Sequence, residues 1–252
     1  MQLTMHTYAE QPEVKNEVYH AVKLPAWQYP FVFEDEVANR LWGRLEDDFA
    51  PFQFVLRDAD AGGAVAAVGH TLPLRWDAPL AELPDRGWDA IFEIAVADFD
   101  AGRTPNLITA IEASVAPAYQ GKGVSRRVIE SMRSIAQERG FPSLVAPVRP
   151  SWKARYPITP IDRYVSWSDE TGAPFDPWLR THWRLGATIV KVAPQSMRIS
   201  GTVAEWEGWT GLKFPDSGTY VVAGALAPIE IDRERDSGVY IEPNVWMHHA
   251  LV

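Results

Sequence analysis

The sequence contains no cysteine, which excludes disulfide bonds, thiolate nucleophiles, cysteine-ligated zinc and iron–sulfur clusters. It also lacks any apolar run close to the roughly 20 residues that a membrane-spanning helix requires. Residues 1–17 are polar and do not have the apolar segment of a secretory signal. From these absences we expect a soluble, cytoplasmic protein with no membrane partner.

Positive charge is also scarce. The 24 Lys and Arg residues are outnumbered by 33 Asp and Glu residues, and the formal net charge is −9. Such a balance is unfavourable for binding to a phosphate polyanion, so we expect no nucleic-acid partner. Adjacent His248 and His249 would point to opposite faces of a strand, and no carboxylate pattern accompanies them. We therefore predict no metal site.

The composition is that of a globular protein, with 252 residues of which 46% are hydrophobic, and we expect a single domain over residues 1–252. The fold class predicted by the pattern of apolar residues is α/β. Strands are predicted over residues 17–24, 52–57, 64–75, 106–116, 143–149, 187–193, 220–233 and 239–246. Helices are predicted over residues 33–48, 88–99, 124–139 and 177–186, and another begins at the capping-box sequence Thr202-Val-Ala-Glu205.

The middle of the chain reads as strand, helix and strand with short links. This order implies a right-handed crossover between two parallel strands, 106–116 and 143–149. Pro147 cannot donate a hydrogen bond to a sheet, so we expect the second strand to lose its pairing near that residue. Two parallel strands that separate at their ends would leave a cleft between them.

The loop Pro117-Ala-Tyr-Gln-Gly-Lys-Gly-Val-Ser125 joins the first of these strands to the helix. A helix start exposes N–H groups that have no intrahelical partner, and glycines let such a backbone approach a ligand closely. The loop is therefore either an anion site or a simple connector with solvated basic residues. It does not have the P-loop pattern, and Arg126 stands where a dinucleotide fingerprint needs its third glycine.

The segment Val115-Ala-Pro117-Ala-Tyr-Gln120-Gly-Lys-Gly123-Val-Ser125 resembles the signature of the GCN5-related N-acetyltransferase (GNAT) family. A second landmark of that family, at the end of a later helix, is echoed by His182-Trp-Arg-Leu-Gly186-Ala187. The resemblance implies a twisted mixed sheet flanked by helices, which opens between its fourth and fifth strands to admit acyl-CoA. It covers a core of about residues 17–193 and leaves an elaborated C-terminal region of about residues 194–252.

The resemblance also implies which residues bind CoA. The pantetheine arm would lie along the strand, and the pyrophosphate would be bound by N–H groups of the loop. The CoA-binding residues implied are Ser114, Val115, Ala116, Gln120, Gly121, Lys122, Gly123, Val124 and Ser125. The Val115 N–H would stabilise the oxyanion that forms when an amine attacks the thioester.

Direct attack by an amine needs one group that takes the ammonium proton and another that protonates the thiolate. Glu112 is our candidate base, because we expect it to share a strand face with the small residues Ala110 and Ser114; a structural role, paired with an arginine, is the alternative. For the acid, His182 stands where the family usually has a tyrosine, and Tyr156 is its rival. Each of these two residues also has a structural alternative, hydrogen bonding for the histidine and packing for the tyrosine.

We therefore interpret the sequence as an acyltransferase that moves an acetyl or short acyl group from CoA to an amine. The acceptor is a small molecule or a peptide, and a homodimer is expected by analogy with the family. The first alternative is a non-catalytic acyl-CoA sensor on the same fold, and the second is a protein that binds a nicotinamide dinucleotide. Only the enzyme would release free thiol in the presence of amines, and only the last would bind NAD and not CoA.

Overall fold

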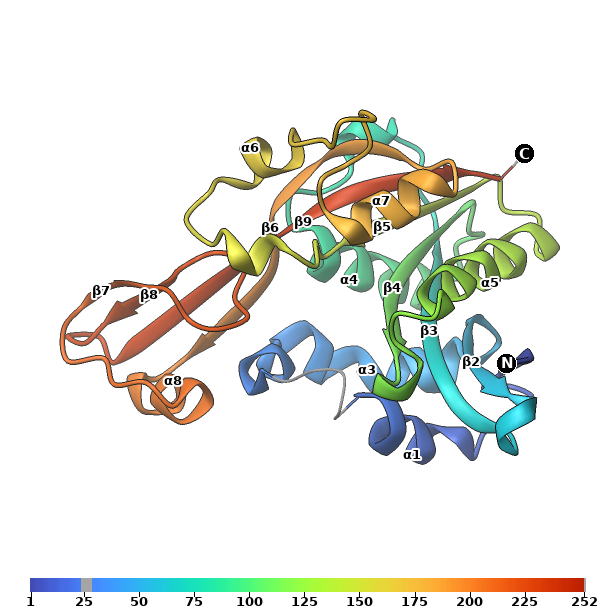
Figure 1. The fold of residues 1–252 in the computed structure, drawn as a ribbon, viewed down its shortest axis with the longest axis horizontal. Coiled ribbons are helices and arrows are strands. Elements are labelled where there is room, and N and C mark those ends of the chain that lie inside the picture. The colour runs from blue at the N-terminus through green and yellow to red at the C-terminus, as the bar shows by residue number, and fades with distance from the viewer. Residues whose placement is uncertain (24–28, 252) are drawn as a thin grey trace.

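The computed structural model describes residues 1–23 and 29–251. Within those residues, nine strands form one mixed sheet with the order β1-β2-β3-β4-β5-β9-β8-β7, and β6 pairs with β9 (Figure 1). The strands are β1 Leu3–Thr7, β2 Gln53–Asp58, β3 Ala64–Leu74, β4 Leu107–Val115, β5 Ser143–Val148, β6 Thr188–Gly201, β7 Gly218–Tyr220, β8 Ile229–Asp232 and β9 Ser237–Ala250. The helices are α1 Val14–Val18, α3 Glu36–Asp48, α4 Gly87–Asp100, α5 Val124–Glu138, α6 Ile161–Val165, α7 Pro177–Arg184 and α8 Val203–Thr210.

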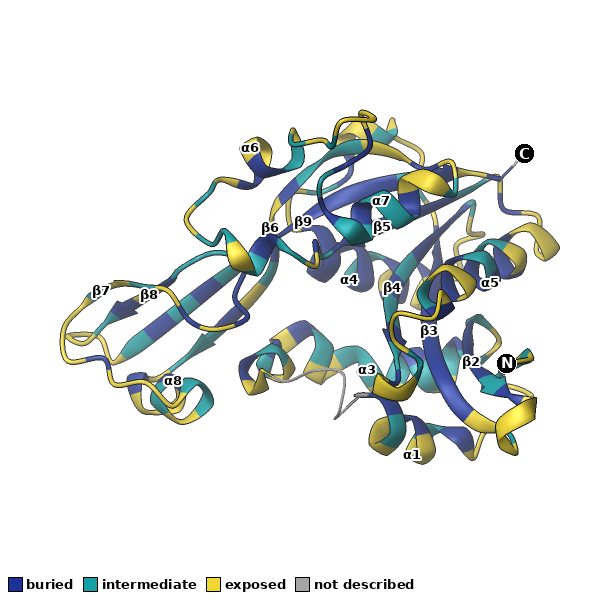
Figure 2. Cartoon of the chain, viewed as in Figure 1, coloured by how far each residue is buried: buried dark blue, intermediate teal, exposed yellow. Residues whose placement is uncertain are grey.

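Strands β1 to β4 form an antiparallel half of the sheet, with helices on both of its faces. Apolar residues of α3 and α4 pack against one face of the sheet, where they contact residues of β3. Apolar residues of α5 pack against the other face. The burial pattern follows these contacts, because β2 and β3 are almost wholly buried and β4 is buried or half-buried, while the outer sides of the helices are exposed (Figure 2). The two apolar layers fix α5, and therefore the loop that precedes it, against β4.

Strand β9 organises the other half of the sheet. Along one of its edges it pairs with β8 through residues 237–240 and with β5 through residues 245–250, while β6 pairs along the opposite edge. The last strand of the chain therefore lies in the middle of the sheet. The boundary expected near residue 194 falls inside β6, and the residues after it continue the same sheet with β7, β8 and β9, while α8 follows directly after β6 (Figure 1).

Most elements expected from the sequence are confirmed. They include the crossover from β4 through α5 to β5, whose strands are parallel, and the capping box at Thr202 and Glu205 that begins α8. The strand expected over residues 17–24 is wrong, because residues 14–18 are α-helical and residues 19–23 form a π-helical turn; Leu24 lies outside the described residues. The strand expected over residues 220–233 is also wrong over its middle, since the chain leaves β7 at Tyr220 and re-enters the sheet only at Ile229.

A β-bulge in β4 changes which residues share a face. Glu112 pairs with His70 and Ala110 pairs with Thr71, so Ile111 is the extra residue. Because His70 and Thr71 point to opposite faces, Glu112 and Ala110 do as well. The prediction that Glu112 shares a face with Ala110 is therefore wrong, while its shared face with Ser114 is confirmed by the pairing of Ser114 with Val68. The bulge turns Glu112 toward the face covered by α3.

Helix α3 is held by a pair of buried carboxyl groups. Asp35 caps the helix by accepting the N–H of Ala38 at 2.8 Å, and Asp89 on α4 accepts the N–H of Arg198 on β6 at 3.1 Å. Burial, together with the neighbouring Asp35 carboxyl, raises the pKa of Asp89 to about 8, and burial also raises the pKa of Asp35. The two carboxyl groups therefore share a proton at neutral pH and connect α3 to α4.

This pair predicts how stability depends on pH. The unfolded chain releases the Asp89 proton near the ordinary aspartate pKa of 3.8, whereas the folded protein holds it up to about pH 8. The free energy of unfolding should thus fall as the pH rises through this window, by at most about 1.4 kcal/mol per pH unit. In Asp89→Asn the amide replaces the protonated carboxyl, so denaturant melts between pH 5 and 8 should show a shallower loss of stability than the wild type. Parallel pH curves for the two proteins would contradict the shared proton.

Candidate active site

A cavity opens where β4 and β5 separate. Over the described residues these strands pair only at Ile108 with Leu144 and at Thr109 with Val145, and beyond Val145 strand β5 pairs only with β9. The loss of pairing near Pro147 is thus confirmed on the β4 side, where the last paired residue of β5, Val145, lies two residues before the proline. The resulting cavity has a volume of about 850 Å³. Residues from both halves of the sheet line it, and they come from α1, α3, β4, β5, α5, α7 and β9 and from the segments between them. The lining residues that bear on the argument below are Lys15, Trp42, Glu46, Glu112, Val115, Gln120, Ser125, Pro147, Arg149, Trp178, His182, Glu242 and Asn244.

The glycine loop lies at one end of this cavity. Gly121 and Gly123 have φ angles of 72° and 78°, which favour glycine, and apart from each glycine and its chain neighbours no described atom lies within 4 Å of the place where a Cβ would be. Gly123 is the N-cap of α5, so the N–H groups that follow it have no intrahelical partner. Gln120 and Ser125 line the cavity. An open backbone at a helix start fits the pyrophosphate of CoA, as the resemblance implies.

The basic residues of this loop are partly neutralised. Arg126 and Arg127 both contact the Glu130 carboxylate, at 2.9 and 2.8 Å. Lys122 lies 5.8 Å from the centre of the Tyr119 ring. Because the single Glu130 carboxylate offsets one of the two guanidinium charges, the loop and the first turn of α5 keep positive charge beside their backbone N–H groups.

The exposed edge of β4 determines which N–H groups face the cleft. Ala116 donates its N–H to Ala66 O on β3 at 3.0 Å, and its side chain is buried. Because N–H groups of neighbouring residues in a strand point to opposite edges, the Val115 N–H points away from β3 and toward the cleft. Of the three positions implied for CoA in and directly after β4, Val115 thus points its N–H toward the cleft, while the N–H of Ala116 is used by the sheet.

Glu112 lies in the wall of the cavity. Its Oε1 accepts a hydrogen bond from Ser114 Oγ at 2.6 Å, and its Oε2 lies 3.6 Å from His70 Nε2. The side chain is 8% exposed. The structure therefore places the carboxylate at the cavity surface, beside a serine and a histidine.

His182 also lines the cavity, at the end of α7. Its Nδ1 is hydrogen-bonded to His249 Nε2 at 2.9 Å, and Trp178 packs edge-on against its ring. Burial lowers the pKa of His182 well below the usual value, and burial lowers the pKa of His249 to about 4. Both rings are therefore neutral near pH 7, so His182 can donate a hydrogen bond to a sulfur atom but does not carry an imidazolium proton.

Tyr156 is placed elsewhere. It packs against Tyr164, Trp167 and Phe175, with ring centres 5.0 to 5.9 Å from its own. It is not among the residues that line the cavity within the described parts of the chain. Of the two candidates for the acid, the structure brings only His182 to the site.

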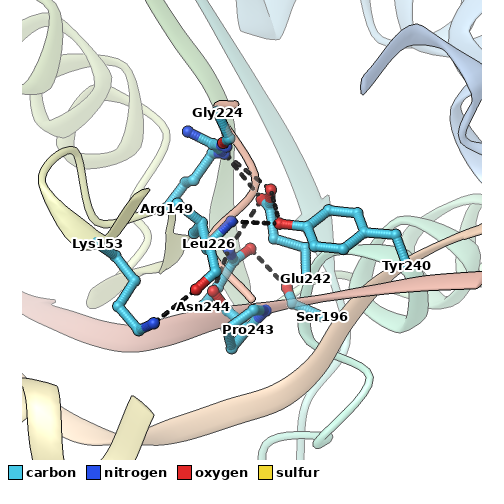
Figure 3. A network of polar contacts seen from close by, with 9 residues as sticks. All are labelled: Arg149, Lys153, Ser196, Gly224, Leu226, Tyr240, Glu242, Pro243 and Asn244. Atoms are coloured by element: carbon cyan, nitrogen blue, oxygen red, sulfur yellow. Dashed lines mark hydrogen bonds and ion pairs between the residues drawn. The ribbon is translucent and has the colours of Figure 1, made fainter. Parts of the chain in front are cut away.

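Strand β9 supplies the floor of the cavity, with side chains that sequence reasoning missed. Arg149, directly after β5, contacts both carboxylate oxygens of Glu242 at 2.9 and 3.0 Å and donates to Gly224 O at 2.7 Å (Figure 3). The Tyr240 hydroxyl donates to Glu242 Oε2 at 3.0 Å. Asn244, also in the cavity wall, accepts a hydrogen bond from Ser196 Oγ at 2.6 Å. This network joins β5 to β9 beyond the end of their ladder.

Neither a metal site nor a membrane helix is found in the part of the chain that the structure describes. Over residues 1–23 and 29–251, no three His, Asp or Glu side chains come together as metal ligands. No helix in the same ranges is long and apolar enough to cross a bilayer.

The split sheet, the glycine loop and the cavity between β4 and β5 are features of an acyl-CoA-dependent N-acyltransferase. The chain belongs to the GCN5-related N-acetyltransferase family and is an enzyme that transfers an acyl group from CoA to an amine. It is 31% identical over 274 aligned residues to the arginine N-acetyltransferase avaD of Aspergillus versicolor, with 98% of this chain and 94% of the relative covered. No protein-family profile matches the chain.

Two solved structures share the fold. The loading GNATL domain of CurA from Lyngbya majuscula has a TM-score of 0.60 and 16% identity, with 100% of this chain and 98% of that chain covered. The GNAT-like decarboxylase GphF, solved with isobutyryl-CoA, has a TM-score of 0.59 and 14% identity, with both chains fully covered. The fold predicted from the resemblance is thus confirmed.

Proposed function

We propose that the protein transfers an acetyl group from acetyl-CoA to the amine of arginine or of a similar cationic acceptor. The observation that carries this proposal is the near full-length similarity to an arginine N-acetyltransferase. The charges of the cavity support it, because three carboxylates of the described chain, Glu46, Glu112 and Glu242, line the cavity together with two cations. Both cations are paired, Lys15 with Asp47 and Arg149 with Glu242.

Glu46 is the carboxylate best suited to a second positive charge on the acceptor. It lies on α3 in the cavity wall, and its Oε1 accepts a hydrogen bond from Trp42 Nε1 at 3.0 Å. A carboxylate held beside an indole ring offers a guanidinium both an ion pair and an aromatic face. A guanidinium stays protonated at neutral pH, so it would be bound as a cation while the α-amine acts as the nucleophile.

Three residues that line the cavity, Glu112, Val115 and His182, have a role in the transfer. Acetyl-CoA brings the acetyl group as a thioester. Glu112 accepts one proton from the acceptor's ammonium, which frees the lone pair that attacks the carbonyl carbon. The Val115 N–H stabilises the oxygen that becomes negative. When the carbon–sulfur bond breaks, the sulfur keeps the electron pair and receives the second proton of the nitrogen. His182 donates a hydrogen bond from its Nε2–H to that sulfur and keeps the proton, in the tautomer in which His249 Nε2–H donates to His182 Nδ1.

The direct test is the release of free CoA thiol in the presence of acetyl-CoA and either arginine or citrulline. Citrulline has the same length but no positive side chain, so it is the matched control. We expect arginine to be the preferred acceptor, with N-acetylarginine identified by mass spectrometry. Equal rates with citrulline would refute a cationic acceptor. Binding of acetyl-CoA without thiol release across a broad panel of amines would favour the non-catalytic sensor.

Glu46→Gln tests the acceptor site separately. Loss of one charge-assisted pair should raise the KM for arginine about 10-fold or more. The KM for acetyl-CoA and the rate with citrulline should not change, because neither depends on the Glu46 charge. An unaltered arginine-to-citrulline ratio, measured by steady-state kinetics, would contradict the role of Glu46.

We further propose that residues 1–252 form one domain and that the protein is cytoplasmic and homodimeric. A single sheet that uses both the first and the last strands supports one domain. The absence of cysteine supports a reducing compartment. Among the described strands, β1, β6 and β7 have only one pairing partner each, and such edges are where sheets of two copies pair. Gel filtration with light scattering tests the dimer.

A further inference from the structure

His70 is a buried histidine on β3, directly opposite Glu112, and its sequence context gives it no evident role. Its side chain is fully buried, and its Nε2 lies 3.6 Å from Glu112 Oε2. The edges of Tyr8 and Trp42 meet its ring at centre distances of 5.5 and 5.2 Å. The ring is thus held on both sides, with one nitrogen aimed at the carboxylate that we propose as the base.

Gln53 fixes which nitrogen of His70 carries hydrogen. The amide Nε2 of Gln53 donates to Phe49 O and to Thr71 O, both at 2.8 Å, so its orientation is determined by two carbonyl groups. Its Oε1 is then an acceptor, and it accepts the N–H of Thr71 at 3.1 Å. The same Oε1 lies 3.0 Å from His70 Nδ1. An amide oxygen cannot donate, so His70 Nδ1 must carry the hydrogen.

In the neutral ring, the Nε2 of His70 therefore presents a lone pair to Glu112. A lone pair beside a carboxylate is unfavourable, but it becomes favourable once that carboxylate has taken up a proton. The other oxygen of Glu112 is already held by Ser114 Oγ at 2.6 Å. The arrangement thus discriminates between the carboxylate before and after proton transfer, which is what a base needs from its surroundings.

We propose that His70, fixed by Gln53, is a positioning residue that acts through Glu112. Once Glu112 has removed the acceptor's proton, His70 Nε2 accepts a hydrogen bond from Glu112 Oε2 and so orients the protonated carboxyl group. The proton moves from the acceptor nitrogen to Glu112 and leaves to solvent after the product departs; His70 gains no covalent bond. The inference rests on the proposed role of Glu112 and deepens it, since it names the side chain that responds when the Glu112 carboxylate becomes neutral.

Two substitutions test separately the contact of His70 Nδ1 with Gln53 and the contact of His70 Nε2 with Glu112. In His70→Asn the amide retains a donor near Nδ1 for Gln53 but is too short to reach Glu112. In His70→Gln a longer amide reaches the position of Nε2, where its oxygen can accept a hydrogen bond from Glu112, but the ring N–H that fixes the side chain against Gln53 Oε1 is lost. We expect both variants to lose about 10- to 100-fold in kcat with little change in KM for acetyl-CoA or acceptor, because misplacement of a base by about 1 Å costs about this much. Thermal melts of each variant check that the fold is retained.

A double-mutant cycle with Glu112→Gln is the decisive measurement. If His70 acts through Glu112, then His70→Asn should have no further effect on kcat once Glu112 is replaced. A full additional loss in the Glu112→Gln background would show that His70 serves only packing and would overturn the proposal. So would a wild-type kcat in both His70 variants. These results differ from a failure of the proposed function, in which the wild type itself releases no thiol or Glu112→Gln retains full activity.

Discussion

Replacing Glu112 by glutamine should lower kcat by about 100- to 1,000-fold while acetyl-CoA still binds. The amide preserves size and can still accept the Ser114 hydrogen bond at the position where Oε1 accepts it at 2.6 Å. It cannot take the proton of the acceptor's ammonium, so the nucleophilic form of the acceptor is no longer generated in the cavity. Steady-state thiol release measures the loss. Stabilisation by acetyl-CoA in a thermal melt, which should equal that of the wild type, shows that the donor site is intact.

The same variant should recover part of its activity in alkaline buffer. The α-amine of the acceptor loses its proton in alkaline buffer, so at high pH the acceptor already arrives with a free lone pair and needs the base less. The ratio of wild-type to variant rates should therefore shrink between about pH 7 and about pH 9.5. An unchanged ratio over this range would mean that Glu112 does something other than remove the acceptor's proton, and full activity at neutral pH would remove it from the mechanism.

Replacing Glu242 by alanine should destabilise the protein by about 3–5 kcal/mol, because it removes the carboxylate that Arg149 contacts with two bonds in a buried position. Glu242 is 1% exposed, so solvent does not weaken this pair as it does at the surface. The change also removes the acceptor of the Tyr240 hydroxyl. Urea unfolding followed by tryptophan fluorescence measures the difference.

Glu130→Ala is the matched control. Glu130 also contacts arginine side chains, Arg126 and Arg127, but both of these are more than half exposed. Exposed pairs contribute about 0–1 kcal/mol, so this variant should unfold close to the wild-type midpoint. Equal losses of unfolding free energy in the two variants would contradict the idea that burial makes the Arg149–Glu242 pair contribute more to stability.

The parts of the site that could be predicted depend on residues close together in the sequence. The glycine loop at Gly121 and Gly123 could be found in the sequence, because positive φ angles and a helix start are local properties, but only the resemblance to the GNAT signature related it to CoA. The crossover through α5 and the capping box of α8 are local in the same sense. The roles of Glu112 and His182 in catalysis stay predictions, although the structure places both in the cavity wall.

The parts that could not be predicted depend on pairing between distant segments. Arg149 and Glu242 are 93 residues apart, and no spacing rule connects them. The bulge at Ile111 is set by how β4 pairs with β3, so simple alternation assigned Glu112 and Ala110 to the same face. A polar His70 inside the apolar run of residues 64–75 was a signal available in the sequence, but its partner Gln53 lies on another strand.

The central place of β9 has a consequence for how the protein is made. A ribosome completes β1 to β5 and α5 long before it reaches residues 237–250, so the glycine loop can take shape while β5 still lacks the neighbour that it pairs with along residues 245–250. During that interval the nascent chain exposes an unpaired β5 edge, which is a site for wrong pairing. Release of the final residues closes this edge and at the same time adds Glu242 and Asn244 to the cavity. Chaperone dependence during synthesis, and loss of soluble protein when the last strand is removed, are the expected signs of this order.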